Sequence, residues 1–206
     1  MLVKKIIMDM LPSMWPLITF VCVVAISMRL TFLKGSKKFI LYKELMTLVF
    51  IIYILCLYYV VTGQDMNPGT NNFIPFKEIM RYDVTSSLFY RNVIGNILLF
   101  IPFGYMITDM LRLKAGKCNI FIASLLTILT SLSTEVIQMF IGRSFDIDDI
   151  FLNFIGGLFG FVLYYIFHFI YKKLPERYHN NGFKLMCYLM ICLIFITLFA
   201  LFYTMR

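Results

Sequence analysis

The stretch IFIASLLTILTSLSTEVIQMFI, residues 120–141, decides the fold class. A helix crosses the hydrocarbon core of a bilayer with about 20 predominantly apolar residues, and this stretch meets that length. Its polar side chains recur every three or four residues, which places them along one face of an α-helix: Ser124, Thr127, Ser131, Glu135 and Gln138. The stretch therefore predicts a transmembrane helix with one polar face.

The composition of the whole chain agrees with a membrane protein. Of its 206 residues, 61% are hydrophobic and 15% are charged, against roughly 45–50% and 25% in soluble domains. The mean hydropathy is +0.84. A soluble globule of this size could not bury so much apolar surface. The net charge of +8 is therefore interpreted as a signal of topology and anionic lipid, and no nucleic-acid partner is expected.

The five cysteines are not grouped with each other or with histidines. A disulfide framework and a structural zinc site are therefore not expected. The first apolar run is too long for a signal peptide and lacks a small-residue cleavage site, so it is interpreted as a span.

Six apolar runs are candidate membrane spans, and five spans are the alternative count. We expect an all-α, polytopic protein in three parts: two N-terminal helices in residues 1–61, a core with a long loop and three helices in residues 62–172, and a C-terminal helix in residues 173–206. The six runs are residues 14–33, 45–61, 92–108, 120–141, 150–171 and 183–203.

The basic residues predict the orientation. Eleven Lys and Arg lie in the loops on one face of the six-span arrangement, and seven lie on the other face. By the positive-inside rule, the basic loops are cytoplasmic and both termini are external, although Lys4 and Lys5 weigh against the second assignment. The segments 62–91 and 142–149 then share the external face of the bacterial cell membrane.

The loop of residues 62–91 is long for an unstructured connection, and long loops are often functional. Its first part, QDMNPG at residues 64–69, is typical of turns. The next part, NNFIPF at residues 71–76, changes from polar to apolar. We expect this segment to fold back against the bilayer interface.

Polar residues gather at the external ends of three consecutive spans. Burying such groups in lipid is costly, so an intramembrane carboxylate such as Glu135 is a functional candidate by default. The topology predicts that the members of this cluster converge in space: Asn92, Asn96, Glu135, Gln138, Arg143, Asp146, Asp149 and Asn153. No cofactor is expected. A divalent cation is compatible with Glu135, Asp146 and Asp149.

Each of these residues also has a structural interpretation. Asp146 and Asp148 suit the N-terminus of a helix. Arg143 could pair with one of the carboxylates, and Asn96 and Asn153 could join helices.

Several other residues are interpreted as structural. Gly156 and Gly160 have the spacing that lets two helices approach closely, within one chain or between two chains. Pro102 predicts a kink. His168 and His179 fall near the cytoplasmic side, and neither is expected to be catalytic.

Four motifs follow one another along the middle of the chain. They are NFIPF at 72–76, NVIGNILLFIPFG at 92–104, SLSTEVIQ at 131–138, and RSFDIDD at 143–149 with Asn153 and two glycines behind it. In this order they resemble the motifs of the VanZ-like family, which is linked to teicoplanin resistance in Gram-positive bacteria. The resemblance covers about residues 71–165. The eight residues of the polar cluster occupy the family's polar motif positions. The resemblance implies lowered susceptibility to lipoglycopeptides and names no settled enzymatic activity.

Three mechanisms follow as alternatives. In the first, an external polar cavity binds a membrane lipid, a lipid-linked cell-wall intermediate or the lipoglycopeptide itself, and so disturbs the membrane anchoring of teicoplanin. In the second, the protein is a membrane-embedded enzyme that modifies a lipid headgroup with a carboxylate-bound cation. In the third, it is a small lipid transporter or flippase. The sequence leaves the ligand and the oligomeric state open.

Overall fold

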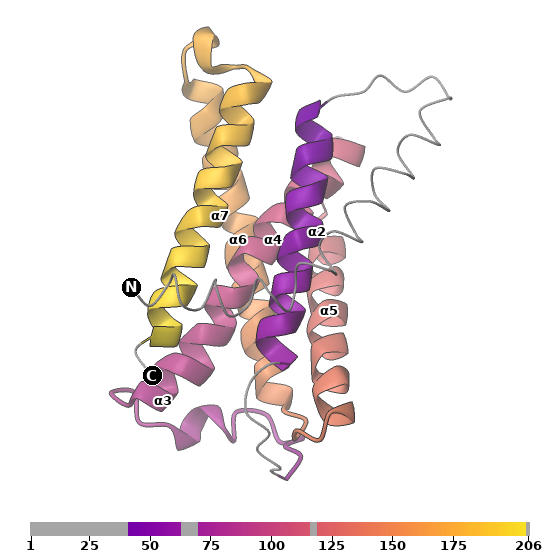
Figure 1. Ribbon diagram of the computed structural model, residues 1–206, viewed down its shortest axis with the longest axis vertical. Helices are drawn as coiled ribbons and strands as arrows, with labels where there is room; N and C mark the ends of the chain where they lie inside the picture. The colour runs from indigo at the N-terminus through magenta and orange to yellow at the C-terminus, as the bar shows by residue number, and fades with distance from the viewer. Residues whose placement is uncertain (1–40, 63–69, 116–118, 205–206) are drawn as a thin grey trace.

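The computed structural model describes residues 41–62, 70–115 and 119–204, and the described part is helical apart from loops and one isolated β-bridge (Figure 1). The long helices are α2 (Leu41–Thr62), α4 (Gly95–Ala115), α5 (Ile120–Phe140), α6 (Ile147–Lys173) and α7 (Asn181–Thr204). The short ones are η1 (Ile79–Arg81), α3 (Ser87–Phe89), the π-helix η2 (Tyr90–Ile94) and η3 (Glu176–Tyr178).

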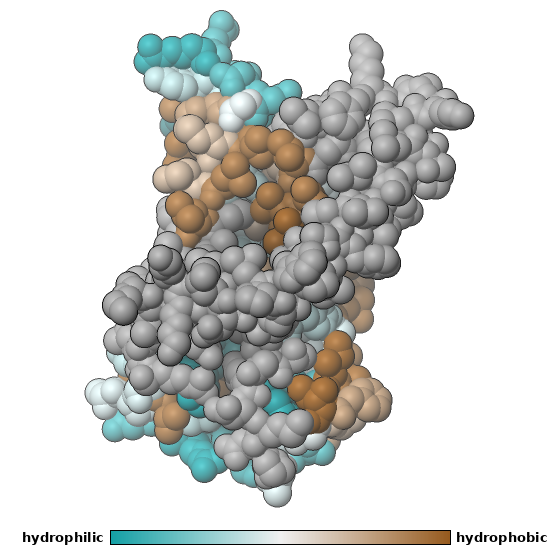
Figure 2. Space-filling model, in the orientation of Figure 1, coloured by the Kyte–Doolittle hydropathy of each residue, from teal (hydrophilic) through white to brown (hydrophobic). Residues whose placement is uncertain are grey.

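Three helices of the described chain are long and apolar enough to cross a membrane: Ser87–Arg112, Ile120–Phe140 and Ile147–Lys173. The predicted spans at 45–61 and 183–203 are also helical, as α2 and α7. The predicted span at 14–33 lies outside the described residues. On the face shown in Figure 2, hydrophilic residues lie at the two ends of the molecule and hydrophobic residues lie between them.

Local signals fix where the helices begin and end. Asn119, Asp146 and Ser86 accept hydrogen bonds from backbone N–H groups in the first turn of α5, α6 and α3. At the end of α5, Gly142 has φ +86°. The Arg143 N–H donates to the Gln138 carbonyl and the Gly142 N–H to the Met139 carbonyl, a Schellman motif that turns the chain towards α6.

The third predicted span is longer than expected. Instead of beginning at residue 92, its helix begins at Ser87 and passes through a π-helical turn before α4. Pro102 lies inside α4 without ending it. Proline lacks an N–H group, so the carbonyls in the turn before it need other donors. The Tyr53 hydroxyl, on α2, donates to the Leu99 carbonyl in this turn.

Glycines let α6 lie against the backbone of α4. A Cβ atom built on Gly156 would be 2.2 Å from the Ile97 carbonyl oxygen, and one on Gly160 would be 2.1 Å from that of Ile101. A Cβ on Gly104, from the α4 side, would be 2.1 Å from the Gly157 carbonyl oxygen. These glycines therefore serve packing within the chain, one of the two roles predicted for them.

Both α2 and α7 pack on this α4–α6 pair. One buried cluster draws on all four helices: Met46, Tyr105, Met106, Tyr164, Tyr188 and Ile191. A second cluster joins Leu57 of α2 to Phe100 and Phe103 of α4. On α5, the predicted polar face is turned into the protein, since Thr127, Ser131, Glu135 and Gln138 are buried, while apolar side chains such as Leu129 and Phe140 are exposed.

Candidate functional site

The two loop segments of the predicted site meet at one end of the bundle, at the bottom of Figure 1. Asn72 and Asp146 form a parallel β-bridge. The Asn72 N–H donates to the Phe145 carbonyl at 2.8 Å, and the Ile147 N–H donates to the Asn72 carbonyl at 3.1 Å. The segment before α3 and the connection from α5 to α6 therefore lie at the same end of the helices, as the sequence predicts.

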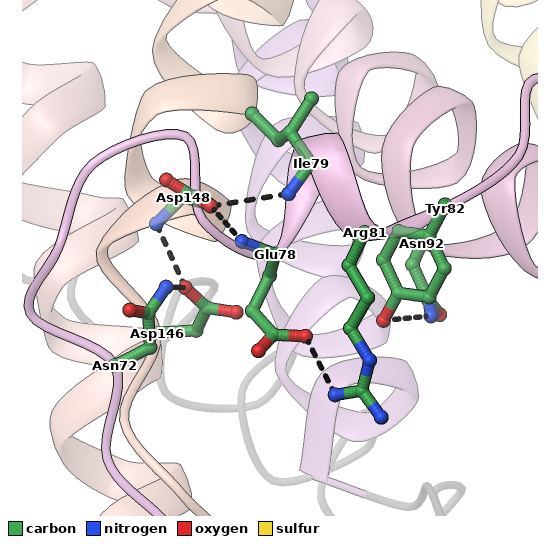
Figure 3. Close-up of polar contacts among 8 residues, drawn as sticks. All are labelled: Asn72, Glu78, Ile79, Arg81, Tyr82, Asn92, Asp146 and Asp148. Carbon is green, nitrogen blue, oxygen red and sulfur yellow. Dashed lines mark hydrogen bonds and ion pairs between the residues drawn. The ribbon is translucent and has the colours of Figure 1, made fainter.

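Asp148 fixes the first of these segments against α6. Its carboxylate accepts hydrogen bonds from the backbone N–H groups of Phe76, Glu78 and Ile79 at 2.5, 2.8 and 3.2 Å, and its side chain is 2% exposed. Figure 3 shows the bonds to Glu78 and Ile79. Phe76 has φ +66°, which is unfavourable for a residue with a side chain. The Asp148 carboxylate offsets this strain by receiving three donors at once.

Asp146 connects the segment, α5 and α6. Its carboxylate caps α6 by accepting from the Asp148 N–H and also accepts from the Asn72 side chain, both at 2.9 Å. Its own N–H donates to the Glu135 carboxylate at 3.0 Å. Burial raises the pKa of Asp146, and the charges of Asp148 and Glu78 raise it further, against the lowering effect of the two hydrogen bonds.

Deeper in the bundle, the polar residues join the three helices in pairs. The Asn96 side chain donates to Asp149, from α4 to α6. The Asn153 side chain donates to the Ser131 hydroxyl at 2.9 Å, from α6 to α5. The side-chain oxygen of Asn153, Oδ1, is buried without a hydrogen-bond partner among the described residues.

Glu135 is the most enclosed charged group of this cluster, with 2% of its surface exposed. One of its oxygens accepts from the Asp146 N–H. Arg143 lies close enough to interact electrostatically with both Glu135 and Asp149, and its pairing with one of the carboxylates stays a prediction. The three carboxylates of Glu135, Asp146 and Asp149 also interact with one another.

The structure thus brings together seven of the eight predicted residues around the α5–α6 connection and the α4–α6 contact. Gln138 belongs to this group as a buried side chain on α5. Asn92 is the exception, since its side chain donates to the Tyr82 hydroxyl at 2.9 Å near the start of the third span (Figure 3).

The predicted metal ligands are engaged in hydrogen bonds. Oxygens of Glu135, Asp146 and Asp149 accept from a backbone N–H, from Asn72 and from Asn96 respectively. In the described parts of the chain, no group of three or more His, Cys, Asp or Glu side chains is placed to hold a metal ion.

Two residues of the site were not predicted as members. Asp148 was interpreted only as a helix cap, although its carboxylate holds the loop. Asn72 contributes both its backbone and its side chain. The sequence contained a signal for Asp148. Asp146 already caps α6, so the two further acidic residues in its first turn, Asp148 and Asp149, indicate that one of them binds a partner outside the helix.

A second polar group lies at the opposite end of the bundle. The Arg112 guanidinium contacts the His168 ring nitrogen at 2.6 Å and lies over the Tyr164 ring. Asp109 is 7% exposed, and its Oδ2 has no hydrogen-bond partner among the described residues. His179 contacts the Tyr171 carbonyl at the same end. Both histidines therefore lie away from the polar cluster, as predicted.

Comparison with known proteins matches the chain to a protein family. The family model described as VanZ/LLP1 matches residues 20–168, a range that contains α2, α4, α5 and most of α6. No curated protein and no solved structure shows a significant match.

Proposed function

Because the chain belongs to the VanZ/LLP1 family, we propose that it lowers the susceptibility of a Gram-positive bacterium to lipoglycopeptides such as teicoplanin. In this proposal the protein acts at the outer leaflet, where teicoplanin anchors its acyl tail and where lipid-linked cell-wall intermediates are exposed. Vancomycin lacks that tail, so the effect is selective for teicoplanin.

The observation that carries the proposal is the buried polar cluster that joins α4, α5 and α6 at the loop end of the bundle. Several ionisable groups within apolar helices are costly to bury, and such groups usually have a function. Here Glu135, Asp146 and Asp149 share one site with Arg143, and a folded loop covers the helix ends. A lipid or lipoglycopeptide would be recognised at this end.

The proposed orientation follows the basic residues. The loops on the side of the α6–α7 connection carry the excess of Lys and Arg and are cytoplasmic in a six-span arrangement. The segment that Asp148 holds and the α5–α6 connection are then external.

Antibiotic susceptibility in a sensitive Gram-positive host tests the proposal, with membrane levels matched by immunoblot. We expect this protein to lower teicoplanin susceptibility and leave vancomycin susceptibility unchanged, relative to an empty vector. Glu135→Gln should abolish the effect. The glutamine carbonyl can still accept from the Asp146 N–H, so this variant removes the charge and keeps the contact.

Equal protection against both antibiotics, or full protection by Glu135→Gln, would contradict the proposal. Lipid extracts from the same cells separate binding from catalysis. A new lipid that depends on Glu135 would support the headgroup-modifying enzyme, and an unchanged lipid profile is expected for a binding protein.

A further inference from the structure

The segment of residues 73–91, called here the surface segment, exposes an unusual amount of apolar side chain. Phe73 is 65% exposed, Met80 82% and Val84 63%, and three further large side chains are also exposed: Ile74, Phe76 and Leu88. Exposed apolar groups gathered in one short segment mark a surface that contacts another phase or another molecule.

This apolar surface continues into that of the membrane-spanning helices. The Phe73 ring stacks on Phe145, with centroids 5.2 Å apart. The Phe76 ring meets the edge of Phe151 at 5.0 Å. Phe151 is itself 42% exposed on α6, a helix apolar enough to cross the membrane. Lipid that surrounds α6 would therefore also reach the surface segment.

The backbone of the surface segment is held across the helix ends. Asp148 accepts from the N–H groups of Phe76, Glu78 and Ile79. In η1, which follows, the Arg81 N–H donates to the Glu78 carbonyl. The bonds to Asp148 hold residues 76–79 beside the first turn of α6, next to the apolar surface of that helix.

The polar side chains of the surface segment suit a layer of lipid headgroups. It carries three basic and two acidic residues: Lys77, Arg81, Arg91, Glu78 and Asp83. Arg81 pairs with Glu78 at 3.2 Å. Lys77 and Arg91 are exposed towards the two ends of the segment, and the Arg91 Nε donates to the Asn92 side-chain oxygen at 3.4 Å. Tyrosine favours membrane–water interfaces, and the segment contains Tyr82 and Tyr90.

We propose that the surface segment binds phospholipid, with its apolar side chains at the boundary between acyl chains and headgroups and with Lys77 and Arg91 at lipid phosphates. This deepens the proposed function, because it names phospholipid as the surface on which the loop end acts. It rests on that function only for the choice of the outer leaflet.

Tryptophan fluorescence in reconstituted vesicles tests the depth of the segment. The chain has a single tryptophan, Trp15, so Trp15→Phe provides a background for Met80→Trp. The vesicles contain phosphatidylcholine and phosphatidylglycerol, with bromine either close to the headgroup or near the end of the acyl chain. A second sample replaces the brominated lipid with aqueous iodide.

We expect the Met80→Trp signal to be quenched more strongly by bromine close to the headgroup than by bromine near the chain end, and to be largely shielded from iodide. Leu129→Trp is the matched control, because Leu129 is exposed near the middle of α5 and should show the opposite order. Bromine quenching of Met80→Trp should be stronger in vesicles that contain phosphatidylglycerol than in vesicles of phosphatidylcholine alone. Adding Lys77→Gln and Arg91→Gln should reduce this difference.

Two results would overturn the proposal. Quenching by iodide without quenching by brominated lipid would place the segment in water. Shielding from both quenchers would mean that protein covers it, from the remainder of the chain or a second copy. Antibiotic susceptibility does not enter this experiment, so the depth of the segment and the proposed function can fail separately.

Discussion

At the scale of single residues, Asp148 shows how one carboxylate can organise a loop from within a helix. It occupies the first turn of α6, where negative charge is favourable. It then accepts from three N–H groups more than 65 residues earlier in the chain. Hydrogen bonds to a charged group contribute about 1.5–3 kcal/mol each. The three bonds therefore stabilise the fold by more than a helix cap alone.

Asp148→Ala should release the segment of residues 70–86 from α6. We expect faster tryptic cleavage after Lys77 and Arg81 in detergent micelles. The free energy of unfolding should fall by about 3 kcal/mol, which is less than the sum of three such bonds because the released N–H groups can bond to water. Asp83→Ala is the control, because Asp83 is exposed and its carboxylate bonds only within its own turn. Equal cleavage rates for the two variants would contradict this account.

The sequence predicted most residues of the cluster but not their partners. A spacing of three and four residues placed Asp146, Asp149 and Asn153 on one helical face, and it left Asp148 off that face. The partners of Asp148 come from a loop whose position depends on φ +66° at Phe76, a conformation that helical periodicity does not predict. Long-range contacts of this kind need the tertiary structure.

At the scale of elements, the described helices lie close to the spans predicted from hydropathy, and capping residues mark several of their ends. The helix predicted at 120–141 is observed at Ile120–Phe140, with Asn119 before it and Gly142 after it. The third span was predicted too short at its beginning. The predicted span began after Arg91, so it excluded residues 87–91, which the Ser86 cap brings into the helix.

The glycines of α6 provide a sharp test of helix packing. A Cβ on Gly160 would lie 2.1 Å from the Ile101 carbonyl oxygen and 2.6 Å from the Tyr105 nitrogen. Since backbone atoms cannot move aside cheaply, Gly160→Ala should lower the free energy of unfolding by about 1–3 kcal/mol. The measurement is helix content by circular dichroism during SDS titration in mixed micelles.

Gly95→Ala is the matched control for that titration. Its Cβ would lie 3.7 Å from the Tyr90 carbonyl oxygen, an ordinary contact. Alanine also favours a helix over glycine by about 1 kcal/mol, so this variant should be as stable as the parent or slightly more stable. If Gly95→Ala and Gly160→Ala lost the same free energy of unfolding, close packing of α4 on α6 would not explain the loss in Gly160→Ala.

At the scale of the whole molecule, the two ends of the bundle differ. One end holds the polar cluster and the folded loop, while the other holds Arg112, His168 and the α6–α7 connection (Figure 1). The alternation of the predicted spans places segments 62–91 and 142–149 on one side, and the contact between residues 72 and 146 confirms that the two motif loops share an end. Which end faces outwards stays a prediction.

Cysteine labelling tests the orientation. In a variant whose five native cysteines are replaced, Thr85→Cys should react with a membrane-impermeant maleimide in intact protoplasts, because residue 85 is exposed at the loop end. Arg177→Cys, exposed at the other end, should react only after permeabilisation. Labelling of Arg177→Cys alone in intact protoplasts would reverse the proposed orientation.

The central claim is that the loop end of the bundle, and not the opposite end, carries the effect on teicoplanin. Two aspartate positions, one near each end of the bundle, allow a matched comparison. Asp149→Asn keeps an oxygen that can accept from Asn96. Asp109→Asn changes a group whose Oδ2 has no hydrogen-bond partner among the described residues. Both variants replace a carboxylate with an amide of nearly the same shape.

The most direct measurement is therefore the teicoplanin susceptibility of a sensitive host that carries the parent protein, Asp149→Asn or Asp109→Asn at equal membrane levels. We predict that protection is lost with Asp149→Asn and kept with Asp109→Asn, with vancomycin susceptibility unchanged throughout. Protection that survives Asp149→Asn and disappears with Asp109→Asn would contradict the account and place the function at the opposite end.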